Sequence, residues 1–218
     1  MRRWCESVKW RAMLEHFLDS LVILLVVVDP IGLAPMFGAI TPGADRAFRR
    51  RMALRGTLIA AVILVTFVMF GSDLLRALSI GMPAFQIAGG ALLFLLAVDM
   101  VFARHSGLRS TTEREQREAQ HRQDISVFPL AFPLISGPGA LTTVLLMSGR
   151  HADDVRMLGI VLLVVLVVLA ATLVALLMAD RIMKLMGETG ANVVSRLLGV
   201  ILAALAVQYV LDGLHLTG

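Results

Sequence analysis

A chain of 218 residues with 58% apolar residues and a mean hydropathy of +0.83 is too apolar to fold as a water-soluble globule. The formal net charge is +4, but the 20 Lys and Arg residues flank the apolar segments, which excludes a nucleic-acid-binding face. The lone cysteine, Cys5, excludes an intramolecular disulfide. The sequence therefore predicts an all-α integral membrane protein, with residues 1–218 forming a single transmembrane domain.

Six segments are long and apolar enough to cross a bilayer as helices, which takes about 20 residues each. In chain order they are 13–40, 56–78, 83–103, 125–148, 155–179 and 193–214. The polar stretch 104–124 is expected to form a linker between two halves. Each half then contains three spans, one set in 13–103 and the other in 125–214.

Five of the seven prolines lie inside two of these spans: Pro30 and Pro35 in the first, and Pro129, Pro133 and Pro138 in the fourth. A proline removes a backbone donor and clashes with the preceding turn, and a bilayer holds no water to satisfy the freed carbonyls. Paired broken helices in the two halves of a chain are typical of transporters. We therefore expect the backbone to leave helical geometry within 29–32 and within 136–139, with the two breaks meeting near the centre of the membrane.

The two halves also resemble each other at an offset of about 108 residues. DPIG at 29–32 aligns with GPGA at 137–140, and GALLFLLAVDM at 90–100 aligns with GVILAALAVQY at 199–209. Because each half has three spans, the second half must be inserted upside down. The pattern predicts two inverted three-helix repeats with broken first and fourth helices. Chance similarity between apolar segments is the alternative for the third and sixth spans taken alone.

The basic residues indicate the orientation. The loops between spans one and two, three and four, and five and six hold 13 Lys and Arg residues, and the other side holds 7. The positive-inside rule then places these loops, including the linker 104–124, in the cytoplasm and both termini outside. The basic N-terminal segment opposes this assignment.

Three segments carry a family resemblance. DPIGLAPMF at 29–37 and FPLAFPLISGPGALTTV at 128–144 resemble the two signature segments of the MarC family of six-span bacterial inner-membrane proteins, and FQIAGGALLFLLAVDM at 85–100 resembles its third span. The resemblance covers 18–213. It implies a bacterial inner-membrane location, in which the termini that the basic residues place outside are periplasmic, and transport of small neutral amino acids coupled to protons or another cation, as in some relatives. Leu33 departs from the pattern, because many members have Asn there.

The chemistry of the breaks predicts a site for a zwitterion. Gly32 and Gly139 let the backbone leave helical geometry, and half-helices starting near Leu33 and Ala140 present N–H groups and a positive dipole end to a carboxylate. Freed carbonyls and the carboxylate of Asp29 attract an ammonium group, a sodium ion or a proton. The candidate substrate-binding residues are Asp29, Pro30, Gly32, Ser136, Gly137, Pro138, Gly139, Thr142 and Thr143.

Asp29 is the first candidate for ion coupling, since a charge near the bilayer centre costs about 3 kcal/mol and needs a partner. The alternative is a structural Asp that caps the following half-helix, and one residue can do both. Asp99 is the second candidate, with simple hydration near the membrane surface as its alternative. The hydroxyls of Ser136, Thr142 and Thr143 contact either substrate or their own backbone.

A secondary transporter is the function favoured by the breaks and the repeat. The expected partners are membrane lipid, a small neutral amino acid and a coupling proton or sodium ion, with no nucleic acid, cofactor or metal. An enzyme is disfavoured, because the five His residues lie in loops or near span ends and no GxSxG, HExxH or metal-ligand spacing occurs. A non-transporting membrane scaffold or assembly factor is the alternative, since it needs only the six spans.

Overall fold

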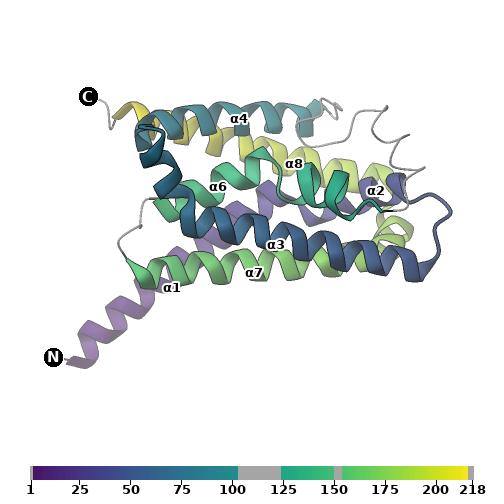
Figure 1. The fold of residues 1–218 in the computed structure, drawn as a ribbon, viewed down its shortest axis with the longest axis horizontal. Coiled ribbons are helices and arrows are strands. Elements are labelled where there is room, and N and C mark those ends of the chain that lie inside the picture. Colours follow the sequence, from purple (N-terminus) through teal and green to yellow (C-terminus); the bar gives the residue numbers. More distant parts are fainter. Residues whose placement is uncertain (1, 103–123, 150–153, 216–218) are drawn as a thin grey trace.

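The computed structural model describes residues 2–102, 124–149 and 154–215, and these form helices and no strand (Figure 1). The elements are α1 (Arg2–Val28), α2 (Pro30–Ile40), α3 (Arg46–Ala77), α4 (Met82–Phe102), η1 (Ser126–Ile135), α6 (Pro138–Gly149), α7 (Val155–Leu177) and α8 (Ala179–His215). α1 begins and α8 ends at the same end of an elongated bundle, as an even number of spans requires. The predicted linker 104–124 lies outside the described residues except for Asp124.

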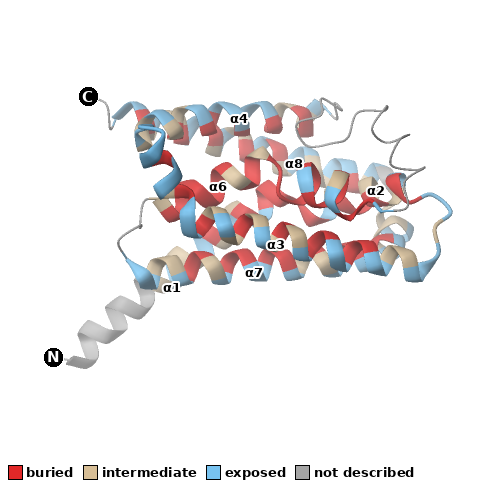
Figure 2. Cartoon of the chain, in the orientation of Figure 1, coloured by how far each residue is buried: buried red, intermediate tan, exposed pale blue. Residues whose placement is uncertain are grey.

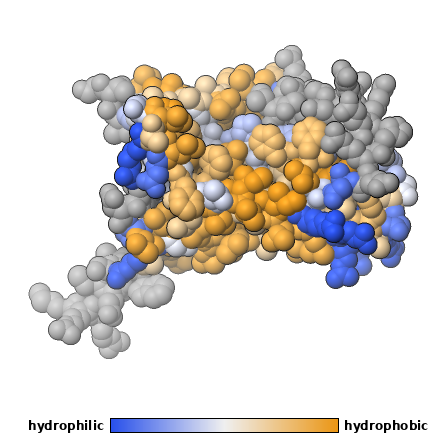
Figure 3. Space-filling view, viewed as in Figure 1, coloured by the Kyte–Doolittle hydropathy of each residue, from blue (hydrophilic) through white to orange (hydrophobic). Residues whose placement is uncertain are grey.

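The all-helical membrane architecture is confirmed. Five helical stretches are long and apolar enough to cross a bilayer, and the bent pair η1 and α6 brings the number to six when it counts as one span. Large apolar side chains face outward on α3 and α7, among them Leu58, Phe70 and Leu163. Figure 3 shows apolar side chains over the middle of the visible face and hydrophilic ones toward its two ends. This is the surface that a bilayer requires.

The first predicted break lies at Asp29. Its backbone adopts the left-handed conformation, with φ 45° and ψ 72°, and separates α1 from α2. α2 begins at Pro30 rather than near Leu33, and α6 likewise begins at Pro138 rather than near Ala140. Proline suits the first helical position, because its φ is preset for the helix and no N–H is needed there. The half-helices are therefore longer than the sequence predicted.

The second predicted break lies at 136–137, where η1 and α6 meet at 58°. The segment before it differs from the expected helix. Phe128 and Phe132 are extended, and each precedes a proline through a cis peptide bond. A residue before proline is pushed out of the α region, and two prolines in one helix interior would remove two backbone hydrogen bonds. The first half of the fourth span is therefore irregular rather than α-helical.

Asp124 fixes the start of η1. Its Oδ1 accepts hydrogen bonds from the backbone N of Ser126 at 2.8 Å and from Ser126 Oγ at 2.6 Å, and Arg55 of α3 lies 3.4 Å from Oδ2. These hydrogen bonds from Ser126, with the nearby Arg55 charge, hold the pKa of Asp124 below its usual range. The irregular segment is thereby tied to the neighbouring α3.

The two half-helices that follow the breaks lie in the interior of the bundle. α6 contacts α1, α3, α4 and α7, and α2 contacts α7 and α8. Figure 2 shows buried positions concentrated along α6. The breaks are therefore surrounded by protein, as irregular backbone at membrane depth must be.

α4 and α8 pack against each other through a reciprocal pair of glycines. A Cβ atom on Gly90 would lie 2.7 Å from the carbonyl oxygen of Ala206, and one on Gly199 would lie 3.1 Å from the carbonyl oxygen of Ala97. Gly199 and Ala206 are the positions that the sequence alignment pairs with Gly90 and Ala97. Gly90 therefore contacts Ala206, and its counterpart Gly199 contacts Ala97, the counterpart of Ala206. A two-fold axis between the two repeats would produce such a reciprocal contact.

α8 is longer than the predicted sixth span and is divided by a kink at Gly187, where φ is 65° and ψ is 177°. The apolar span runs over Thr189–His215. Arg181 and Lys184, expected in a loop, lie in the helical turns before the kink, and Arg196 lies in the span itself.

The reciprocal contact predicts equal sensitivity at its two glycines. Gly90→Ala and Gly199→Ala should each lower the stability of the purified protein by about 1–3 kcal/mol, because the added methyl group meets backbone atoms that cannot move aside. Gly159→Ala is the matched control, since nothing lies within 4 Å of its Cβ position. Thermal unfolding in detergent measures all three, and a neutral Gly90→Ala would contradict the packing.

Candidate functional site

Asp29 is fully buried, and both of its carboxylate oxygens have partners. Oδ1 accepts a hydrogen bond from the backbone N of Gly32 at 3.0 Å, and Oδ2 accepts one from Ser195 Oγ at 2.7 Å. The carboxylate therefore caps α2 and neutralises its positive end, which is the structural role that the sequence left open. A Cβ on Gly32 would collide with Asp29 Oδ2, so only glycine fits under this cap.

Ser195 is a site residue that the sequence analysis missed. It lies on α8 and reaches the first break across 166 residues of chain. One signal was present, because position 195 is the repeat counterpart of Gln86, a buried polar residue in the third span. Paired polar positions in two apolar spans indicate two sites that face the bundle interior.

The backbone groups at the second break have different hydrogen-bond partners. Ser136 donates from both its backbone N, at 2.9 Å, and its hydroxyl, at 2.6 Å, to the carbonyl oxygen of Ala131. The Ser136 hydroxyl therefore donates to the backbone of its own chain segment rather than to a substrate, which is one of the two roles that the sequence left open. The backbone hydrogen bonds of α6 begin with the bond from Leu141 N to Gly137 O, at 3.0 Å. The N–H groups of Gly139 and Ala140 come before this bond, so they have no acceptor within the helix. The positive end of α6 consequently has no carboxylate cap of the kind that Asp29 gives α2.

Thr143 adds an unused hydroxyl to this end of α6. It is fully buried, and its Oγ1 has no hydrogen-bond partner. Leaving such a group unpaired costs about 1–3 kcal/mol, so buried hydroxyls usually find partners. Thr143 lies four residues after Gly139 and hence on the same helical face. The methyl carbon Cγ2 of Thr142 packs against Gly89 of α4.

The structure brings the two breaks together. A Cβ on Gly139 would lie 3.4 Å from Val27 Cγ1, two residues before Asp29, and 3.2 Å from Leu93 Cδ2 of α4. The N-terminus of α6 therefore packs against the last turn of α1. The end of α1 before the first break and the start of α6 after the second break are therefore neighbours, and Ser195 of α8 bonds the residue at the first break.

Asp99 lies apart from the breaks, in the last turns of α4. Its exposure is 9%, so it is buried rather than hydrated at the membrane surface. Its neighbours Met100 and Val101 pack against Gly199, one helical turn beyond Ser195. Asp29 and the α4 turn that carries Asp99 therefore contact successive turns of α8.

A cavity of about 210 Å³ lies between α1, α6 and α8. Met147 lines it and is one helical turn beyond Thr143. The other lining residues are His16, Asp19, Ser20, Ile23, Leu146 and Tyr209. In the described part of the chain no three His, Cys, Asp or Glu side chains form a metal-binding group. The cavity is polar enough to hold water or a small polar solute beside the buried region.

Comparisons with known proteins agree on one family. The family model described as MarC family integral membrane protein matches residues 14–217. A UPF0056 membrane protein from Archaeoglobus fulgidus is 35% identical, over 92% of this chain and 93% of its own. The UPF0056 inner membrane protein YhgN from Escherichia coli K12 is 30% identical, over 93% and 98%. The UPF0056 membrane protein YvbG from Bacillus subtilis is 32% identical, over 93% and 95%. No solved structure matches.

The hydrogen bond to Ser195 predicts a specific loss of stability. Ser195→Ala should destabilise the protein by about 1–3 kcal/mol, because it removes a 2.7 Å hydrogen bond to a buried carboxylate oxygen of Asp29. Ser148→Ala is the matched control, since its hydroxyl only bonds Leu145 O in its own helix, at 3.3 Å. Thermal unfolding should separate the two variants, and equal unfolding temperatures would show that the cap does not depend on α8.

Proposed function

Since the chain belongs to the MarC family of integral membrane proteins, we propose that it is a secondary transporter of small neutral amino acids, coupled to protons or sodium ions. The substrate binds where the two helix breaks meet. The observation that carries the proposal is the contrast between the breaks. The N-terminus of α2 is capped by the carboxylate of Asp29, whereas the N-terminus of α6 offers a positive helix end with the unpartnered hydroxyl of Thr143 beside it. The proposal includes no enzymatic step.

The substrate carboxylate binds at the N-terminus of α6. The N–H groups of Gly139 and Ala140 and the positive helix end favour an anion there. The unpartnered Oγ1 of Thr143 is available to donate to the same carboxylate from one turn further on. Gly139 packs directly against Leu93 and Val27, which leaves little room for a bulky side chain beside it. These constraints favour glycine, alanine or serine over larger amino acids.

Asp29 supplies the opposite pole. Its carboxylate lies at the adjacent break, where an ammonium group, a proton or a sodium ion is attracted by the negative charge. Any of them binds next to the hydrogen bond that Oδ2 accepts from Ser195. Because Ser195 belongs to α8, occupancy of the site is linked to the position of the last span. Asp99 of α4 is the second candidate for coupling, because its neighbours Met100 and Val101 pack against Gly199, one turn beyond Ser195 on α8.

Alternating access follows from the inverted repeat. The reciprocal glycine contact between α4 and α8 supports a pseudo-two-fold axis between two repeats, at about 13–103 and 125–214. The cavity lined by His16, Asp19 and Tyr209 lies between the helices α1, α6 and α8, toward the end of the bundle that carries both termini. With the termini on the periplasmic side of an inner membrane, this cavity is the outer approach to the site.

Counterflow tests transport directly. Proteoliposomes loaded with unlabelled alanine and placed in trace labelled alanine should accumulate label transiently above equilibrium, and empty liposomes should not. Labelled glutamate serves as the substrate control, because its second carboxylate has no counterpart in the site. Absence of counterflow for glycine, alanine and serine would favour the non-transporting scaffold.

Asp29→Asn should separate capping from coupling. Asparagine keeps an acceptor oxygen for the N–H of Gly32 but carries no negative charge and exchanges no proton near neutral pH. We expect a normally folded variant that retains exchange of alanine but no longer accumulates it under an imposed proton or sodium gradient. Unchanged gradient-driven uptake would make Asp29 structural and transfer the coupling role to Asp99.

Thr143→Val should lower substrate affinity without lowering stability. The valine keeps the shape of threonine and removes a buried hydroxyl that has no partner, so the unfolding temperature should stay level or rise. The half-saturating alanine concentration should increase about tenfold, as for loss of one hydrogen bond to a charged group. Thr57→Val is the matched control, since Thr57 Oγ1 on α3 is also buried and unpartnered. An equal effect of both variants on affinity would remove Thr143 from the site.

A further inference from the structure

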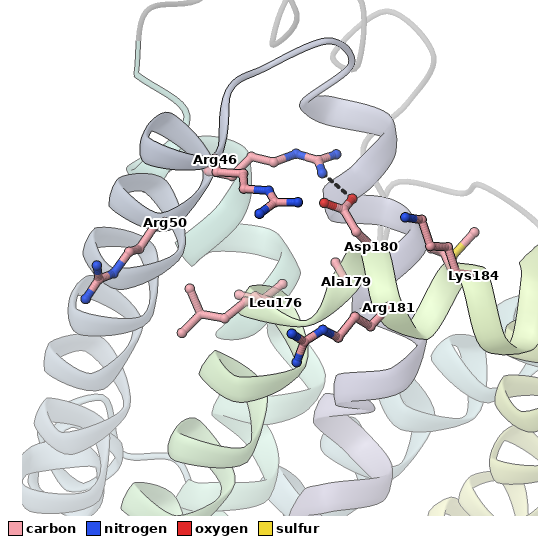
Figure 4. Close-up of a pocket in the computed structure, with 10 residues that line it drawn as sticks. Arg46, Arg50, Leu176, Ala179, Asp180, Arg181 and Lys184 are labelled. Carbon is pink, nitrogen blue, oxygen red and sulfur yellow. Dashed lines mark hydrogen bonds and ion pairs between the residues drawn. The ribbon is translucent and has the colours of Figure 1, made fainter.

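A second cavity, of about 710 Å³, lies at the end of the bundle opposite the termini (Figure 4). It opens between the first turns of α3, the end of α7 and the first turns of α8. Its charged lining consists of Arg46, Arg49, Arg50, Asp180, Arg181 and Lys184. Five cations and one carboxylate therefore surround a single space.

Only one of the five cations is neutralised. Arg49 forms an ion pair with Asp180, and its Nε donates to Thr41 Oγ1 at 3.0 Å. Arg46, Arg50, Arg181 and Lys184 have no carboxylate partner among the described residues. Four like charges around one cavity repel one another, so the site is complementary to an anion with more than one negative oxygen.

The rest of the lining is apolar. Leu176 and Leu177 end α7, and Met183 lies on the first turns of α8. Figure 4 shows Leu176 below Arg46 and Asp180, with Arg181 and Lys184 on the first turns of α8 beside it. Leu185, on the same turns, is 87% exposed, which suits contact with lipid at a membrane surface. A cavity lined by both basic and apolar side chains fits an amphiphilic ligand better than a free ion.

We propose that this cavity binds the phosphate of an anionic phospholipid, with the start of its acyl chains against Leu176, Leu177 and Met183. Basic pockets between membrane helices suit such headgroups, and the planar guanidinium groups of Arg46, Arg50 and Arg181 match phosphate oxygens. Cardiolipin, with two phosphates, best fits the four cations that have no carboxylate partner in the described part of the chain. Bound there, the lipid joins α3 of the first half to α8 of the second. Lipid binding in this cavity does not depend on whether the protein transports a substrate.

Native mass spectrometry of the full chain in detergent tests the site. Titration with cardiolipin should give a saturable one-to-one complex and a higher unfolding temperature. Phosphatidylethanolamine, which has no net charge, should give neither at the same concentration. Inorganic phosphate distinguishes a free anion from a lipid. Stabilisation by phosphate equal to that by cardiolipin would overturn the lipid assignment.

Variants that remove positive charge and a variant that removes negative charge test whether the lipid binds in this cavity. Arg181→Gln/Lys184→Gln removes two cations and should weaken cardiolipin binding about thirtyfold. Asp180→Asn removes the one carboxylate and frees Arg49, so it should tighten binding about fivefold, which misfolding cannot imitate. Arg76→Gln/Arg156→Gln is the matched control, because it removes two cations at the other end of the bundle. Equal weakening in the control, or unchanged affinity in Asp180→Asn, would overturn the site.

Discussion

The structure depends on one constraint: a helix that stops inside a hydrocarbon layer must have its backbone groups satisfied by the chain itself. α1 stops at Asp29, whose carboxylate takes the N–H of Gly32 and the hydroxyl of Ser195. The first bond demands a glycine at 32, because a Cβ would collide with the carboxylate. The second demands that α8 pack against the break. The first break thus fixes the position of the last span.

The two breaks meet this constraint in different ways, and the difference gives the site its polarity. The repeat counterpart of Asp29 is Gly137, which has no side chain to cap α6. Ser136 directs its hydroxyl back to Ala131 O, so the positive end of α6 keeps N–H groups outside the helical ladder. Two symmetric breaks would offer two equal poles. One capped break and one uncapped break offer a negative and a positive pole, which is what a zwitterion requires.

The sequence predicted the parts of the fold that have local causes. Pro30 and Pro138 mark the breaks because proline acts on its own helix, and apolar length marks the spans. The geometry of η1 was missed because two prolines four residues apart exclude an α-helix without specifying its replacement. Ser195 and the burial of Asp99 were missed because they result from α8 packing against distant segments. A single hydroxyl in an apolar span carries no signal of its partner.

α8 contacts the first half of the chain at three levels. Asp180 pairs with Arg49, Ser195 bonds Asp29, and Gly199 packs against α4. A straight helix would force all three contacts to move together. The kink at Gly187, in a left-handed conformation that residues with a side chain rarely adopt, divides α8 between the first contact and the other two. The surface turns that bond α3 and the span that bonds the first break are therefore separate segments of α8, and the proposed alternating access would use this separation of an anchor from a moving part.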